Sequence, residues 1–153
     1  LTRTLVRAAV LEFESPADAL RRVNDLLIPD TKQGMFETAV YAVLDMEKCE
    51  LHYVNAGHNP PLWVKCDGTL QRLTRTGVAL GASEEAKYEQ RVIQFEREDN
   101  LLLYTDGLTE SFNIDGDFFV EERLIEAIQA SRCSSASELL DVVEPFGDAG
   151  EVP

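Results

Sequence analysis

The sequence predicts an α+β fold, with two helices at the start, about six strands in the middle and two helices at the end. Residues 1–13 and 16–28 carry apolar side chains at helical spacing. Short runs rich in β-branched and aromatic residues follow between residues 35 and 105, and helical spacing returns after residue 120. Because strands and helices are segregated along the chain, the sheets should be mostly antiparallel.

Two amphipathic helices are predicted at the start of the chain. In the first, one face carries Leu1, Leu5, Ala8, Ala9 and Phe13. A second helix over residues 16–28 should begin with the Ser15 hydroxyl as its cap, Pro16 with its preset φ, and Asp18 near the positive helix end. Its apolar face comprises Ala19, Leu20, Val23, Leu26 and Leu27.

The middle of the chain reads as a series of hairpins. Residues 35–45 and 49–56 should pair around a turn, and the alternating apolar residues of the first strand imply cover on both of its faces. Residues 61–65 and 69–73 flank a Cys66-Asp67-Gly68 turn and should form a second hairpin. A third pairing is expected between residues 88–95 and 100–105, around residues 96–99.

Helical spacing marks the final third. Leu124, Ala127 and Ile128 share one face, and Ser135 with Glu138 forms the capping-box pattern ahead of a further helix. The apolar face of that last helix comprises Leu139, Val142, Val143 and Phe146.

Composition limits the class of protein. The 153 residues are one domain's worth of chain, no apolar run approaches 18 residues, and no signal segment opens the chain, so we expect a soluble, cytoplasmic protein without membrane insertion. The net charge of −14 repels nucleic acid and anionic membranes. Three cysteines without metal-like spacing favour reduced, buried thiols.

The stretch LLLYTDGLTES, residues 101–111, places Asp106 directly after an apolar strand. An Asp-Gly pair is often only a turn, and the chain contains two others, Asp67-Gly68 and Asp115-Gly116. A carboxylate held at a strand end is, however, also a rigid ligand for a hard divalent cation.

A second polar loop follows another strand. The segment HYVNAGHNPPLW, residues 52–63, gathers Asn55, His58 and Asn59 ahead of two prolines. These side chains could simply satisfy the backbone of a rigid loop, and His52 fits a partly exposed strand position. Two histidines six residues apart do not make a zinc site.

Several motifs together resemble one enzyme family. The chain contains four motifs in order: NAGHNPPL, the glycine pair Gly77 and Gly81, LLLYTDGLTES, and GDFFVEERL. Their order and spacing are similar to those of bacterial metal-dependent protein phosphatases of the 2C type, in the SpoIIE and RsbU-like branch. The resemblance runs from residue 1 to about Phe146. It implies two packed, mostly antiparallel sheets flanked by helices, an α-β-β-α sandwich, of which residues 1–153 would be a single partial domain.

The same resemblance implies a function and a site. The activity would be hydrolysis of phosphoserine or phosphothreonine in a protein, with two Mn²⁺ or Mg²⁺ ions in the complete domain. Asp106 would be a metal ligand, and Asn55 and His58 would be active-site loop residues without an assigned acid or base role. The phosphoprotein substrate would be an anti-sigma-factor antagonist, and a sensory domain upstream is compatible with this branch.

Some parts of the family pattern are not found in the sequence. An Asp-x-Ser-Gly-His-Gly segment is expected upstream and an Asp-Asp pair downstream, and Asp148 and Glu151 do not replace that pair. Val120 stands where the family usually has glycine. Because one carboxylate alone binds Mg²⁺ or Mn²⁺ poorly, we expect this chain by itself to be inactive or weakly active. Unpaired sheet edges would favour aggregation or a homo-oligomer.

Two other interpretations remain open at this level. The chain could be a non-catalytic regulatory or binding module that retains the phosphatase fold without its metal site. It could also be an ordinary α+β domain in which the Asp-Gly pairs only form turns.

Overall fold

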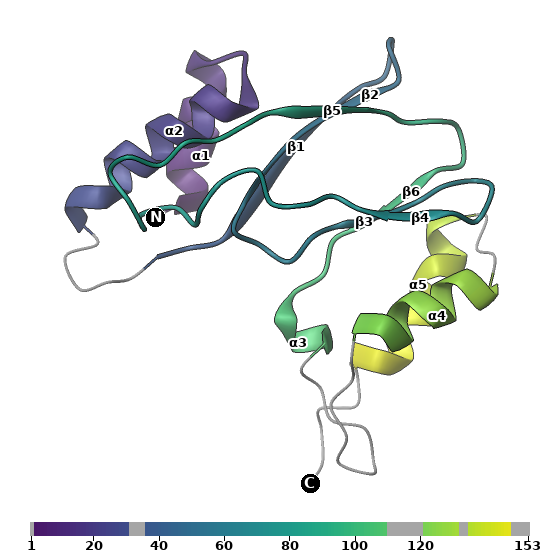
Figure 1. Ribbon diagram of the computed structural model, residues 1–153. Helices are drawn as coiled ribbons and strands as arrows, with labels where there is room; N and C mark the ends of the chain where they lie inside the picture. The colour runs from purple at the N-terminus through teal and green to yellow at the C-terminus, as the bar shows by residue number, and fades with distance from the viewer. Residues whose placement is uncertain (1, 31–35, 110–120, 132–134, 148–153) are drawn as a thin grey trace, which may run out of the picture. The chain divides into compact units, whose positions relative to one another are not determined.

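A computed structural model describes residues 2–30, 36–109, 121–131 and 135–147 (Figure 1). The chain divides into two compact units. Unit 1 comprises residues 1–60 and 74–95, and unit 2 comprises residues 61–73 and 96–153. Each unit contains one antiparallel three-stranded sheet and helices of its own, which confirms the predicted α+β class.

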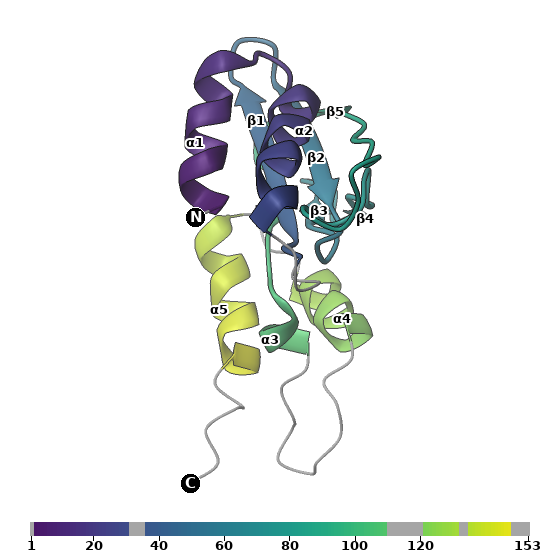
Figure 2. The ribbon, with the colours of Figure 1, turned by 90° about the vertical axis from the view of Figure 1, so that its left-hand side faces the viewer.

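Unit 1 is built on the sheet β1-β2-β5, formed by Ala39–Asp45, Glu50–Ala56 and Arg91–Gln94. The predicted hairpin of the first two strands is confirmed, with Ala39 opposite Ala56 and Asp45 opposite Glu50. Helices α1 (Thr2–Glu12) and α2 (Pro16–Leu27) lie side by side over this sheet (Figure 2), and the short 3-10 helix η1 (Ile28–Asp30) follows.

The core of unit 1 lies between α2 and one face of the sheet. Leu20 and Val23 of α2 are fully buried and pack with Val54 and Ala56 of β2. Leu26, predicted to be on the buried face, is 37% exposed. The cover of β1 also ends early: Val43 is 41% exposed, so the prediction that the whole strand is covered was wrong. Among the described residues of β1, Ala39 and Tyr41 pack against the cluster formed with the helices.

Helix α2 begins where the sequence predicts, but its cap differs. Ser15 occupies the N-cap position and makes no side-chain hydrogen bond to the helix. Its hydroxyl instead donates to Gln90 Oε1 at 3.3 Å, beside strand β5. A tertiary contact has therefore replaced the predicted local one.

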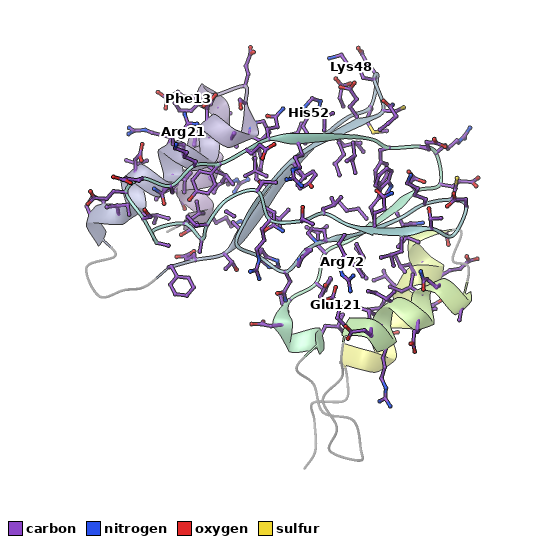
Figure 3. The ribbon with its side chains drawn as sticks, viewed as in Figure 1. Phe13, Arg21, Lys48, His52, Arg72 and Glu121 are labelled. Carbon is purple, nitrogen blue, oxygen red and sulfur yellow. The ribbon has the colours of Figure 1, made fainter. Side chains whose placement is uncertain are left out.

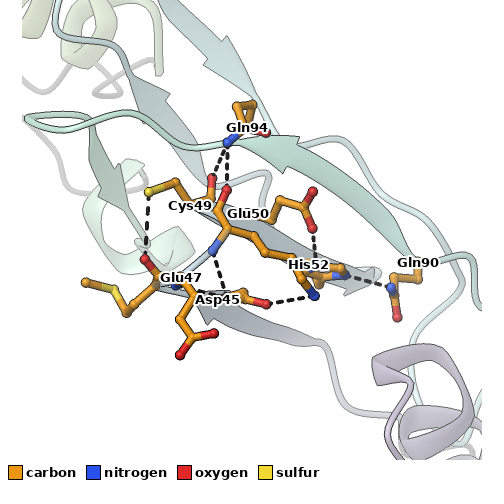
Figure 4. Close-up of polar contacts among 9 residues, drawn as sticks. Asp45, Glu47, Cys49, Glu50, His52, Gln90 and Gln94 are labelled. Carbon is orange, nitrogen blue, oxygen red and sulfur yellow. Dashed lines mark hydrogen bonds and ion pairs between the residues drawn. The ribbon is translucent and has the colours of Figure 1, made fainter.

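The tip of the β1–β2 hairpin is held by a polar cluster (Figure 4). Asp45 Oδ1 accepts from the backbone N–H groups of Glu47 and Lys48, both at 3.0 Å, and the Lys48 contact lowers the pKa of Asp45. Gln94 of β5 donates to the carbonyls of Lys48 and Cys49. The turn is thereby fastened to the third strand of the sheet.

Unit 2 contains the sheet β4-β3-β6, formed by Leu70–Arg72, Leu62–Val64 and Asn100–Leu102. The predicted second hairpin is confirmed, with Trp63 opposite Gln71. The predicted third hairpin was wrong: β5 pairs with β2 in unit 1, whereas β6 pairs with β3 in unit 2. The turn at residues 96–99 is instead hydrogen-bonded to β3 and the residues after it. Asp99 accepts from Trp63 Nε1 and from the Cys66 N–H, both at 2.9 Å.

Helices α3 (Asp106–Thr109), α4 (Glu121–Ser131) and α5 (Ala136–Gly147) complete unit 2. The predicted inward face of α4 is confirmed by Leu124 and Ile128, which are buried with Leu139 and Val143 of α5 against the sheet residues Leu62 and Leu102. Ser135 caps α5 by accepting from the Glu138 N–H at 3.3 Å.

The described residues include two of the three cysteines. Cys49 and Cys66 are free thiols as predicted, but both are exposed, so their predicted burial was wrong. The structure has, over the same residues, no helix both long and apolar enough to cross a membrane. Asp115-Gly116, Val120, Cys133, Asp148 and Glu151 lie outside the described residues.

Candidate metal centre

Asp106 is the first residue of α3, and residues 103–105 separate it from the end of β6, so the strand predicted over residues 100–105 ends three residues early. Leu102, the last residue of β6, and Tyr104 are buried, whereas Asp106 is exposed. The Leu108 N–H donates to the Thr105 carbonyl at 3.0 Å, so the chain turns into the helix at this residue. The predicted Asp-Gly turn is therefore a helix start that presents a carboxylate at the surface.

A three-residue contact holds the segment next to Asp106. Glu121, the first residue of α4, accepts at Oε1 from the Tyr104 hydroxyl at 3.0 Å and from Arg72 Nε at 2.8 Å. Figure 3 shows Arg72 and Glu121 facing one another between β4 and α4. Burial of the phenol, and then its hydrogen bond to Glu121, raises the pKa of Tyr104. The hydroxyl therefore stays protonated as a donor at neutral pH.

Asn55 is fully buried near the end of β2, where its backbone and side chain bond to neighbouring segments of the same chain. Its backbone N–H donates to the Thr76 hydroxyl at 3.0 Å, and its carbonyl accepts from the Thr76 N–H at 2.9 Å. Its side-chain Oδ1 accepts from the His58 N–H at 2.9 Å. Asn55 therefore shapes the loop that follows it.

His58 is partly buried, and its Nδ1 lies 3.0 Å from the Asn59 carbonyl, which makes Nδ1 the protonated nitrogen in this contact. The His58 carbonyl accepts from Arg75 Nε at 3.4 Å. The loop also needs glycine at position 57, where φ is +75° and an added Cβ would lie 2.9 Å from the Ala79 backbone nitrogen.

The structure joins two of the three predicted site residues. Asn55 and His58 are bonded to each other in unit 1, and Asp106 belongs to unit 2. His52, given only a strand role, is bonded on both ring nitrogens, to Glu50 Oε2 at 3.1 Å and to Gln90 Nε2 at 3.0 Å (Figure 4). It lines an open groove of about 610 Å³ with Ser15, Val43 and Lys48.

Asp106 fits a Mn²⁺ or Mg²⁺ site in the kind of donor it provides but not in the number of donors. A surface carboxylate is the hard oxygen ligand that these ions prefer. Within the described residues, however, no group of three or more His, Cys, Asp or Glu side chains could hold a metal ion. The described part of the chain therefore offers one ligand and not a closed cage.

The sequence interpretation missed the roles of Tyr104, Glu121 and Arg72. Two of them lie inside the motifs already recognised, LLLYTDGLTES and GDFFVEERL. A tyrosine two residues before the candidate ligand, inside an apolar run, was a signal that its hydroxyl would need a partner. Nothing in the sequence pointed to Arg72.

Comparison with known proteins identifies the family. The sequence profile named "Stage II sporulation protein E (SpoIIE)" matches residues 1–145. The chain belongs to the SpoIIE family. Its relative "Phosphoserine phosphatase RsbU" of Bacillus subtilis is 32% identical over 126 residues, covering 82% of this chain and 37% of RsbU. The chain spans well under half the length of the curated relatives it matches, from 20% to 37%.

Solved structures confirm the fold of this SpoIIE-family chain. A structure of RsbU and RsbW domains from Mycobacterium tuberculosis matches with a TM-score of 0.78 at 24% identity, over 95% of this chain and 42% of that one. The catalytic domain of the serine/threonine phosphatase PstP, solved with two manganese ions, matches with a TM-score of 0.65 at 18% identity, over 97% and 75% of the two chains. The predicted 2C-type phosphatase fold is therefore confirmed.

Proposed function

We propose that this chain is part of the catalytic domain of a metal-dependent phosphoserine or phosphothreonine protein phosphatase, with Asp106 as a metal ligand. The observation that carries the proposal is the position of Asp106. Its carboxylate is exposed at the start of α3, directly after a segment whose Leu102 and Tyr104 are buried in the core. In a SpoIIE-family chain with a relative named as a phosphoserine phosphatase, such a fixed carboxylate is suited to hold a catalytic cation.

Electrostatics explain why a cation is needed beside this carboxylate. Two like unit charges 4 Å apart repel by roughly 4 kcal/mol at an effective dielectric constant of 20. Such repulsion disfavours a phosphate group beside the bare carboxylate of Asp106. Bound Mn²⁺ or Mg²⁺ supplies positive charge for the phosphoryl oxygens and lowers the pKa of water. Asp106 contributes the negative oxygen that keeps the cation in place.

We propose a phosphorylated anti-sigma-factor antagonist as the substrate. The name of the relative RsbU, a phosphoserine phosphatase, supports a substrate that carries phosphoserine. The strongly acidic chain, with a net charge of −14, disfavours nucleic acid as a partner. Four expectations from the sequence stay predictions: that the chain is a single partial domain, that a sensory domain lies upstream, that the protein forms a homo-oligomer, and that it is cytoplasmic.

Two aspartates of the same chain allow a matched test. Asp106 and Asp67 both precede glycine, but Asp67 closes a turn by accepting from the Thr69 N–H at 2.8 Å and the Thr69 hydroxyl at 2.6 Å. In the full-length protein, Asp106→Asn should lower Mn²⁺-dependent release of phosphate from a phosphoserine peptide on the order of 100-fold, or about 3 kcal/mol. Asp67→Asn should stay within about twofold of the parent protein, since the turn it closes is remote from catalysis in this proposal.

Turnover by Asp106→Asn equal to that of the parent protein at saturating Mn²⁺ would refute the role of Asp106. A full-length protein that binds the phosphoprotein but releases no phosphate at any Mn²⁺ concentration would instead favour the non-catalytic binding module.

A further inference from the structure

Two side chains of unit 2 donate to one carboxylate oxygen of a third. Glu121 Oε1 lies 2.8 Å from Arg72 Nε, at the end of β4, and 3.0 Å from the Tyr104 hydroxyl, beyond the end of β6. Glu121 itself opens α4. This Tyr104–Glu121–Arg72 contact therefore ties two edges of the sheet to a helix at one point.

Tyr104 is the buried member of the contact. Its residue is 7% exposed, and its ring packs in the cluster that contains Leu62, Leu102 and Leu124. A ring fixed on all sides has few rotamers open to it, and its hydroxyl then finds one partner in Glu121. The side chain of Tyr104 is held at both its apolar body and its polar tip.

Arg72 gives the contact its charge. The side chains of Arg72 and Glu121 are 44% and 29% exposed, so solvent screens the attraction between them. The ion pair therefore acts chiefly by orientation, because the guanidinium of Arg72 keeps the Glu121 carboxylate turned toward Tyr104.

The fixed tyrosine lies two residues before Asp106. On the other side of Asp106, the Leu108 N–H is bonded to the Thr105 carbonyl, and Leu108 packs against the same cluster as Tyr104. The backbone that carries the Asp106 carboxylate is thus held from both directions. A ligand held in this way loses little conformational freedom when it binds a cation.

We propose that Tyr104 and Glu121 are positioning residues, which hold the Thr105–Asp106 segment in the geometry that binds a divalent cation, with Arg72 orienting Glu121. This inference rests on the proposed function, because it takes Asp106 as a metal ligand. Neither Tyr104 nor Glu121 is assigned contact with the metal or the substrate.

Direct metal titration of the full-length protein tests the inference without relying on turnover. Free Mn²⁺ is measured by electron paramagnetic resonance for the parent protein, Glu121→Ala, Glu121→Gln and Tyr104→Phe. Loss of a residue that orients a ligand typically weakens metal affinity by roughly 10- to 100-fold. We expect a loss of that size for Glu121→Ala and a smaller one for Tyr104→Phe. Glu121→Gln keeps an oxygen that can accept both bonds, so it should restore most of the affinity.

An ion pair elsewhere provides the control. Glu89 lies 3.9 Å from Arg91 on the surface of unit 1, and Glu89→Ala should leave the Mn²⁺ dissociation constant within about twofold of the parent value. Circular dichroism checks that each variant retains its helix and strand content. If Glu121→Ala fails to fold, Tyr104→Phe decides, since it removes only the hydroxyl.

The inference is overturned if Glu121→Ala or, in its place, folded Tyr104→Phe binds Mn²⁺ within twofold of the parent protein. Such a result, with Asp106→Asn still losing Mn²⁺ affinity and turnover, would leave the proposed function intact. If Asp106→Asn itself binds Mn²⁺ and turns over normally, the proposed function and the inference both fail.

Discussion

Replacing Asn24 by alanine should be one of the most damaging single changes in unit 1. Asn24 is fully buried in the last turn of α2. Its Oδ1 accepts from the Gly81 N–H at 2.9 Å and from the Tyr88 hydroxyl at 3.2 Å, and its Nδ2 donates to the Ser83 carbonyl at 3.0 Å. One amide thereby joins a helix to a loop more than 50 residues away in sequence.

The expected cost follows from those contacts. Each buried hydrogen bond contributes about 1 kcal/mol net, and more when the partner left behind cannot reach water. The truncated side chain also leaves a small cavity in a tightly packed core. Together these terms give a loss of about 3–5 kcal/mol in the free energy of unfolding, a large share of the roughly 5–15 kcal/mol typical of a domain.

Urea unfolding followed by far-ultraviolet circular dichroism measures this loss in the full-length protein. The control is Asn100→Ala, because Asn100 donates a single exposed hydrogen bond to the Glu98 carbonyl at 3.1 Å. That substitution should cost about 0.5 kcal/mol or less. A loss below 1 kcal/mol for Asn24→Ala would show that the three bonds do not stabilise the fold as reasoned here.

Two further predictions concern unit 1, and the first has a matched control in unit 2. Gly57→Ala should lower the free energy of unfolding by about 2–3 kcal/mol, because a positive φ is combined with backbone crowding from Ala79. Gly68→Ala, with φ of +85° in open space, should lower it by about 1 kcal/mol. Equal losses of the two variants in urea unfolding would argue against the crowding. Burial raises the pKa of Tyr88 from 10.0 to about 12, so the stability contributed by its protonated phenol is present below pH 10 and is lost as the pH rises toward 12. Tyr88→Phe should remove roughly 2 kcal/mol of this alkaline loss, and identical pH profiles of unfolding for the two proteins would contradict the assignment.

The sequence predicted elements whose stabilising contacts are local. The β1–β2 and β3–β4 hairpins form where turn residues separate apolar runs, and α2 begins at Pro16 as its spacing indicates. The class of fold and the family could also be predicted, because the motifs around Asp106 and Gly57 are specific in combination.

Contacts between distant segments were not predictable in the same way. The sequence placed β5 and β6 in one hairpin, since each is a short apolar run beside a turn, but the two strands join different sheets. Strand edges offer the same N–H and C=O groups to any partner, so only packing in three dimensions selects among them. Ser15 shows the same limit, because its hydroxyl bonds Gln90 instead of the helix it precedes.

By itself, the sequence determined where α2 and the first two hairpins form and that Asp106 follows an apolar run, because periodicity and turn chemistry act between near neighbours. Only the tertiary structure decided that Glu121 and Arg72 meet Tyr104 beside that aspartate, and that one asparagine joins α2 to the loop at Gly81. Such contacts depend on the packing that brings residues 17 to 57 positions apart within hydrogen-bonding distance.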